Sequence, residues 1–283
     1  MKINKILNNN AIIVKEPDGE KIVMGAGIAF QKQKNDPVDQ SRIEKIFVMS
    51  DRAKHRQLEE ILSTLPEEHI QLSEEIISYG ESQLGVKINE HIHIALTDHL
   101  SFALDRLVRG MVIKNTLLNE IKVLYPKEFQ IGLYAKALIK ERLGIDIPED
   151  EVGYIALHIY TAKRNAGEMS KTLDITSMMR DIVKVIEDSL KVKLEGHTVS
   201  YERLITHLRF AVQRSESGEP FHELDSDMVH IIREKYKESY AVAKRAGDLI
   251  QKEYGFVLDE SELAYISMQI QRIKTREMVE KNN

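Results

Sequence analysis

The chain has 283 residues, of which 42% are apolar and 30% charged, and it contains no cysteine. This length predicts two or three domains, and the composition is that of an ordinary soluble globular protein. The lack of cysteine excludes disulfides, thiolate nucleophiles and cysteine-ligated zinc. We find no apolar run as long as a membrane span and no signal peptide, so we expect a cytoplasmic protein that is not inserted in a membrane.

The net charge of −5 is unevenly distributed. Residues 1–50 carry eight Lys and Arg against six Asp and Glu, a net charge of +2, which leaves −7 for the remainder. This distribution favours the N-terminal segment as the place where a polyanion would bind.

The first fifty residues have the pattern of strands. Four runs, at residues 2–7, 11–14, 21–24 and 46–49, are rich in apolar and β-branched residues, and a Pro-Asp-Gly turn signal at residues 17–20 separates the second from the third. We therefore expect a small all-β domain, a four-stranded antiparallel sheet. A segment this short buries little surface, so we expect it to be stabilised by dimerisation.

From about residue 57 the apolar spacing becomes helical. One helix face is predicted by intervals of four, three, four and four between Ile92, Leu96, His99, Ala103 and Leu107. A break at residues 167–170 indicates a linker.

The helical part contains an internal repeat. Residues 97–106 match residues 205–214, and residues 151–155 match residues 262–266. We therefore expect two homologous all-α domains, each a helical bundle of about a hundred residues.

Histidines stand at two positions of this repeat. His207 occupies the position of His99, whereas Gln269 occupies that of His158. Each histidine alone is readily explained as a core residue that is satisfied by a hydrogen bond. A polar group on an apolar face in both copies favours a function, and a neutral imidazole can accept a phosphoryl group. Asp98 is a candidate to orient the His99 ring, although adjacent helical residues do not face each other.

A metal site is the alternative from a different functional class. His91, His93, Asp98 and His99 would suit a helical metal-dependent phosphohydrolase. Residues two apart converge on a strand but diverge on a helix, and the spacing here is helical. We therefore expect no metal, no cofactor and no enzymatic activity.

Polar, glycine and aromatic residues accompany the strand runs of the N-terminal segment. Three asparagines at residues 8–10 indicate either a simple turn or amides that bind base edges and sugar hydroxyls. Gly25 and Gly27 allow either a bulge or the close approach of another backbone. Phe30 is either a core aromatic or, followed by Gln31 and a lysine, a stacking platform for an unpaired base. Together these residues favour RNA, because a DNA-binding sugar-operon regulator, the other alternative, would most simply use a helix-turn-helix.

These residues together resemble the BglG/SacY family of bacterial transcriptional antiterminators, in particular those of sucrose operons. The matching motifs, in chain order, are Lys5, residues 7–10, Gly25, and residues 27–32, 96–99, 147–151, 154–159 and 206–210. The resemblance covers essentially the whole chain. It implies a co-antiterminator RNA-binding domain at residues 1–56 and two phosphotransferase-system regulation domains at residues 57–168 and 169–283.

The resemblance also implies sites and partners. A homodimer of the first domain would bind a hairpin with internal loops, the ribonucleic antiterminator, which overlaps a terminator in the leader mRNA of a sugar-utilisation operon. The phosphocarrier HPr and a sugar-specific enzyme II permease would phosphorylate the regulation domains at His99, His158 and His207. The implied RNA contacts are Lys5, Asn8, Asn10, Gly25, Gly27, Phe30 and Gln31.

Two positions depart from the family pattern. Gln269 stands where the second regulation domain would carry its second histidine, and an amide cannot be phosphorylated in this way. Activation through that domain would therefore use His207 alone, or be weakened or absent. Ala26 stands where some relatives carry arginine, which removes one contact to RNA.

Overall fold

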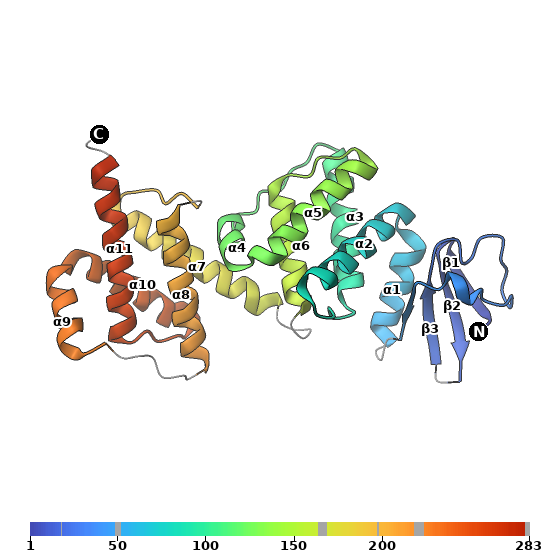
Figure 1. Cartoon of the computed structure of the whole chain (residues 1–283), viewed down its shortest axis with the longest axis horizontal. Helices are drawn as coiled ribbons and strands as arrows, with labels where there is room; N and C mark the ends of the chain where they lie inside the picture. Colours follow the sequence, from blue (N-terminus) through green and yellow to red (C-terminus); the bar gives the residue numbers. More distant parts are fainter. Residues whose placement is uncertain (18, 49–51, 164–168, 197, 218–223, 281–283) are drawn as a thin grey trace. The chain divides into compact units, whose positions relative to one another are not determined.

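A computed structural model describes residues 1–17, 19–48, 52–163, 169–196, 198–217 and 224–280 (Figure 1). The chain divides into two compact units: unit 1 comprises Met1–Lys114 and Lys127–Glu168, and unit 2 comprises Asn115–Pro126 and Met169–Asn283. Position 18 of the expected turn, position 49 of the fourth expected run and positions 167 and 168 of the expected linker lie outside the described residues. Among the described residues, no helix is long and apolar enough to cross a membrane.

Unit 1 begins with the expected four-stranded antiparallel sheet. Its strands follow one another in chain order as β1 (Ile3–Asn8), β2 (Ala11–Glu16), β3 (Gly19–Met24) and β4 (Lys45–Phe47). The central strand β2 is continuously apolar over its first four residues because both faces of the sheet are covered. The structure thus confirms the strands and the helical region that were expected to follow them.

One face of the sheet is covered by the chain between β3 and β4. Ile12, Val14 and Val23 point to this side and pack with Ile28 and Val38 from that connection. The connection also contains a short 3-10 helix, η1 (Gln40–Arg42). It therefore supplies a hydrophobic cover that the short sheet could not provide by itself.

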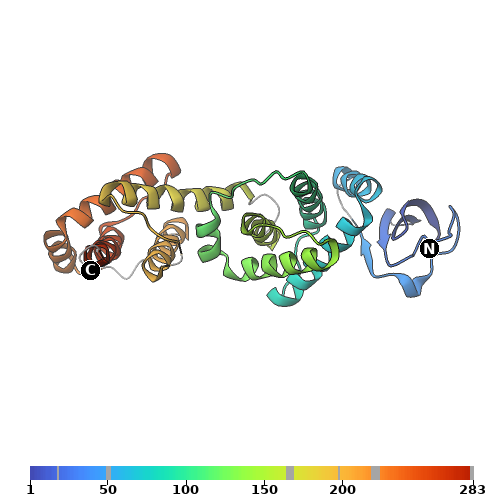
Figure 2. The ribbon, with the colours of Figure 1, turned by 90° about the horizontal axis from the view of Figure 1, so that it is seen from above.

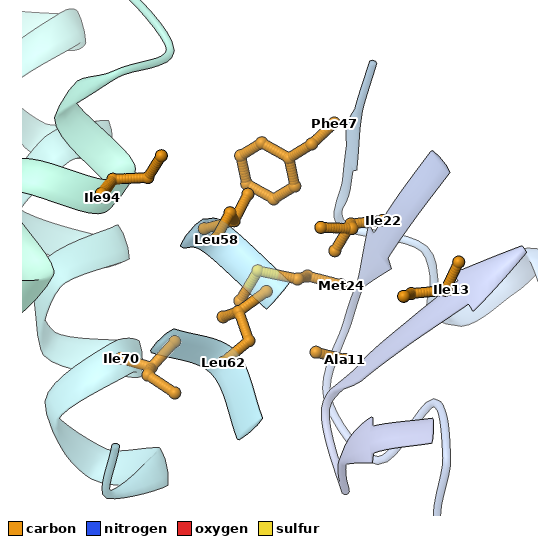
Figure 3. Packing of buried hydrophobic residues seen from close by; sticks show 9 residues of the cluster. All are labelled: Ala11, Ile13, Ile22, Met24, Phe47, Leu58, Leu62, Ile70 and Ile94. Atoms are coloured by element: carbon orange, nitrogen blue, oxygen red, sulfur yellow. The ribbon is translucent and has the colours of Figure 1, made fainter. Parts of the chain in front are cut away.

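The opposite face packs against helices of the same unit (Figure 3). The sheet contributes a patch of five buried side chains, Ala11, Ile13, Ile22, Met24 and Phe47. The helices that meet this patch are α1 (Arg52–Thr64), α2 (Glu67–Leu84) and α3 (Ile92–Val108). They contribute Leu58, Leu62, Ile70 and Ile94. Within unit 1 the sheet and the first helices therefore share one core, which we call the sheet–helix core.

Two further helices complete unit 1 (Figures 1 and 2). They are α5 (Pro126–Leu143), which begins at a proline as helices often do, and α6 (Glu149–Lys163). Helix α3 begins and ends where the apolar spacing predicted a helix, and it packs against α6. The packing of α3 on α6 brings together the histidines of the first repeat copy.

Unit 2 contains one helix whose sequence precedes α5. Its helices are α4 (Leu118–Leu124), α7 (Met169–Leu190), α8 (Val199–Ser217), α9 (Ser226–Lys235), α10 (Lys237–Tyr254) and α11 (Glu260–Glu280). The Tyr201 hydroxyl of α8 donates a 2.7 Å hydrogen bond to Glu120 of α4, and Arg209 donates a 3.0 Å bond to the Leu124 carbonyl. Unit 2 therefore includes α4, although the internal repeat assigns this segment of the sequence to the first copy.

Gly132 allows α5 to approach α6 closely. A Cβ at Gly132 would lie 2.6 Å from the Val152 backbone oxygen, so we expect Gly132→Ala to lower the free energy of unfolding by about 1–3 kcal/mol. Gly80 on α2 is the matched control, because its nearest neighbours to a Cβ lie at 3.6 Å. Gly80→Ala should be neutral or stabilising by up to about 1 kcal/mol through helix propensity. Urea unfolding followed by circular dichroism measures both; equal effects would contradict the close approach.

Candidate functional site

The asparagine turn between β1 and β2 organises one end of the sheet. The Asn8 side-chain oxygen accepts a 2.8 Å hydrogen bond from the Asn10 backbone N–H. Asn10 in turn accepts bonds from two glycine N–H groups, through its carbonyl from Gly25 at 3.0 Å and through its side-chain oxygen from Gly27 at 2.5 Å. The structure therefore brings the asparagines and glycines singled out in the sequence into one hydrogen-bonded cluster.

The glycines serve a close approach of the chain's own backbone. A Cβ at Gly25 would lie 1.7 Å from the Arg42 carbonyl oxygen, so no larger residue fits there. Gly27 has a φ of +61°, and its carbonyl accepts a 2.8 Å hydrogen bond from the Arg42 guanidinium. Of the two interpretations left open by the sequence, close approach of a backbone is therefore the one observed for Gly25.

The residues that follow the glycines face solvent. The Phe30 side chain is 59% exposed, so it does not serve as a core aromatic. Gln31 is exposed as well and has a left-handed backbone with a φ of 55°. An exposed aromatic ring beside backbone N–H groups and amides is suited to stacking on a flat, unpaired base.

Helices α1 and α2 engage three of the predicted RNA contacts. Lys5 Nζ forms a 2.6 Å ion pair with Glu59, and Asn8 Nδ2 donates a 2.7 Å hydrogen bond to the Leu62 carbonyl. The Asn10 side-chain amide donates to the Glu67 carboxylate. Hydrogen-bond donors of these three side chains are thus directed at the helices of the sheet–helix core.

The histidines of the first repeat copy lie side by side. His99 on α3 and His158 on α6 have ring centroids 4.7 Å apart. Burial lowers the pKa of His158 to about 3, with further lowering by the nearby His99 and His91. His158 is therefore a neutral imidazole throughout the physiological pH range.

Two neighbours of His99 were not identified from the sequence. Glu151 on α6 places Oε2 3.4 Å from His99 Nε2, and its other oxygen accepts a hydrogen bond from Arg106 on α3. Asp98 is exposed, so the carboxylate beside the ring belongs to Glu151. The repeat contained a signal for both residues, because each is identical in the second copy.

The second copy contains the same arginine–glutamate pair. His207 on α8 is half-buried, and burial, followed by the charges of three arginines led by Arg214, lowers its pKa. Arg214 donates a 2.8 Å hydrogen bond to Glu262, which corresponds to Glu151. Gln269 is buried at the position that corresponds to His158.

The other histidines near this site have different partners. The Nδ1 atom of His93 lies 2.6 Å from the Glu74 carboxylate, and the buried ring packs edge-on against Phe47 in the sheet–helix core. His91 is exposed at the start of α3. Within the described part of the chain, no group of three or more His, Cys, Asp and Glu side chains could hold a metal ion.

Comparison with known proteins yields matches along the chain. The CAT RNA binding domain family matches residues 1–56, and the PRD domain family matches residues 74–162 and 180–273. The transcription antiterminator LicT of Bacillus subtilis (strain 168) is 40% identical over 274 residues, which cover 96% of this chain and 99% of LicT. The beta-glucoside operon antiterminator of Dickeya chrysanthemi is 36% identical over 97% of both chains.

A solved structure is also similar. The crystal structure of GlcT CAT-PRDI superposes with a TM-score of 0.53 at 37% sequence identity. The match covers 58% of this chain and 98% of the GlcT chain. It supports the arrangement of a four-stranded sheet followed by helices.

The low pKa of His158 predicts a loss of stability in acid. An unfolded histidine binds a proton below about pH 6.5, whereas folded His158 does so only near pH 3, so stability is full above 6.5 and falls as the pH is lowered toward 3. Between pH 7 and pH 5 we expect this group to cost on the order of 2 kcal/mol. Urea unfolding of wild type and His158→Gln at both pH values measures the difference. If both proteins lose equal stability, the pKa of His158 is not depressed.

Proposed function

The chain belongs to the BglG/SacY family of transcription antiterminators, which join a CAT RNA-binding domain to two PRD domains, and we propose that it binds a looped RNA hairpin through the asparagine-turn end of its sheet. The family consists of RNA-binding regulators rather than enzymes. We infer that the hairpin is the ribonucleic antiterminator of a sugar-utilisation operon and that it overlaps a terminator in the leader mRNA.

The observation that carries this proposal is the exposed Phe30 beside the hydrogen-bonded cluster of asparagines and glycines. The ring offers a stacking surface for an unpaired base, and the amides offer donors and acceptors for base edges and 2′-hydroxyls. The proposed RNA contacts are Lys5, Asn8, Asn10, Gly25, Gly27, Phe30 and Gln31.

The proposed regulation acts through histidine phosphorylation in the cytoplasm. His99, His158 and His207 are the proposed acceptors, and HPr and a sugar-specific enzyme II permease are the proposed donors. Gln269 lacks a nucleophilic nitrogen, so the second PRD domain would be phosphorylated at His207 alone. We further propose that the protein acts as a homodimer, whose two RNA-binding ends engage one hairpin.

RNA must compete with α1 and α2 for part of this surface. Lys5 and Asn10 are bonded to the carboxylates of Glu59 and Glu67, which present the same negative oxygens as a phosphate group. Binding of RNA through these two side chains therefore requires that their bonds to α1 and α2 break. This requirement gives α1 and α2 an influence on RNA affinity.

Replacement of Phe30 tests the proposed function. The full chain should bind imperfect RNA hairpins with internal loops more tightly than duplex DNA of the same length at one salt concentration. Phe30→Ala should weaken the RNA complex about tenfold to a hundredfold, because stacking of one base contributes about 1–3 kcal/mol. The matched control is Phe210→Ala, since Phe210 is 50% exposed on α8. Equal binding of RNA and DNA, or equal effects of both substitutions, would refute the proposal.

Removal of the competing carboxylates should raise RNA affinity. We expect the double variant Glu59→Gln, Glu67→Gln to bind the hairpin about tenfold more tightly, because hydrogen bonds to charged groups contribute about 1.5–3 kcal/mol. Glu60→Gln, Glu68→Gln is the control, since it removes the same charge from exposed neighbours on the same helices. Fluorescence anisotropy measures both variants. If the control has the same effect, net charge explains the gain and competition does not.

A further inference from the structure

Three buried polar atoms beside His99 have no hydrogen-bond partner among the described residues. They are His99 Nε2, Glu151 Oε2 and Arg106 Nε, and they come from two facing helices, α3 and α6. Glu151 is only 1% exposed and Arg106 only 10%. Buried polar groups almost always make hydrogen bonds, whereas His99 Nε2 and Glu151 Oε2 lie 3.4 Å apart without one, so this site is a candidate for a bound group.

The same residues recur in the second repeat copy. Arg106 follows His99 by seven residues, and Arg214 follows His207 by the same interval. Each arginine is paired with a glutamate, Glu151 or Glu262, in the first turn of the facing helix. An interval of seven residues is two helical turns, so histidine and arginine share one helix face.

The change at Gln269 shows which histidine the arginine–glutamate pair accompanies. The second copy has lost the counterpart of His158 but keeps both Arg214 and Glu262. The pair therefore goes with His99 and His207, and it is retained where the second imidazole is absent. A buried ion pair contributes little net stability by itself, because desolvation offsets most of the attraction. Net stabilisation therefore does not explain why the arginine–glutamate pair is present in both copies.

We propose that Arg106 is the residue that binds the phosphoryl group on His99, and that Glu151 holds Arg106 in place until that group arrives. Arg214 and Glu262 have the same roles for His207. The inference rests on the proposed function, since it takes His99 and His207 as phosphoryl acceptors. It adds a specific anion-binding residue to each acceptor.

Phosphoryl transfer creates the charge that drives this exchange. The phosphorus–nitrogen bond of the donor breaks, and its electron pair stays on the donor nitrogen, which takes up a proton. A bond forms from phosphorus to the unprotonated nitrogen of the His99 ring, and the proton on the other ring nitrogen is released to solvent. The ring then carries a group of about −2 charge beside the Glu151 carboxylate, 3.4 Å from Nε2 before transfer. Like charges at this distance repel strongly in a buried site.

Arg106 can relieve this repulsion by exchanging the Glu151 carboxylate for the phosphoryl group as its binding partner. Its planar guanidinium binds phosphate oxygens in the same forked geometry as carboxylate oxygens. Arg106 can therefore leave Glu151 for the phosphoryl group and neutralise part of the new charge. Glu151 is released in the first turn of α6, the helix that carries His158. The exchange thus links modification of α3 to the start of α6.

The test uses the full chain with His158→Gln and His207→Gln, so that His99 is the proposed acceptor that remains. Potassium phosphoramidate is the donor, and its nitrogen leaves as ammonia. Phosphorus NMR and peptide mass spectrometry give the initial rate of phosphohistidine formation at position 99. The three variants are Arg106→Gln, Arg106→Lys and Glu151→Gln, each with thermal unfolding measured in parallel.

Replacement of Arg106 and replacement of Glu151 should change the rate of His99 phosphorylation in opposite directions. Arg106→Gln should slow phosphorylation of His99 about tenfold, the loss of one charge-assisted hydrogen bond, and Arg106→Lys should restore most of the rate. Glu151→Gln should accelerate it, because the repelling carboxylate is gone. Arg245→Gln, which removes an exposed arginine of α10, should leave the rate at His99 unchanged.

Two results would overturn the inference. If Arg106→Gln and Glu151→Gln change the rate in the same direction, or Arg106→Lys fails to restore it in a folded protein, the pair has only a structural role. That outcome leaves His99 as an acceptor. If the parent protein gains no phosphoryl group at position 99, the proposed acceptor role of His99 fails as well.

Discussion

The packing of one sheet face against α1, α2 and α3 determines much of unit 1. Met24 and Phe47 point from the sheet toward Leu58 and Leu62 on α1, so that strands and helices form one apolar core (Figure 3). A sheet of four short strands cannot bury both faces with its own residues. The connection between β3 and β4 covers one face, and the helices must cover the other. Burial of this apolar area is the dominant favourable contribution to the arrangement.

This core has a consequence for the polar residues around it. Because α1 and α2 lie against the sheet, their carboxylates reach the donors of Lys5 and Asn10 at its edge. Side chains of the surface proposed for RNA are thereby in direct contact with α1 and α2. The exposed Phe30 lies in the connection that follows β3 and covers the other face, and it stays available. The residues proposed for RNA binding and the first pair of histidines thus belong to the same unit.

The histidine sites rest on a different constraint, the packing of two antiparallel repeat helices in each copy. Helices α3 and α6 bring His99 and Glu151 together although they are far apart in the sequence. In unit 2, α8 and α11 do the same for Arg214 and Glu262. The two copies therefore share an arginine–glutamate pair but differ at the position of His158, where the second copy has an amide, Gln269.

The sequence by itself determined the class of each element and the duplication, since strand and helix periods are local properties of the chain. It also identified the histidines and the asparagine turn, because these residue types stand out against apolar patterns. Only the tertiary structure decided which partners they meet. The Arg106–Glu151 pair, the carboxylates at Lys5 and Asn10, and the placement of α4 in unit 2 all depend on contacts between distant segments. Such contacts leave no period in the sequence, because they join side chains from segments that are far apart along the chain.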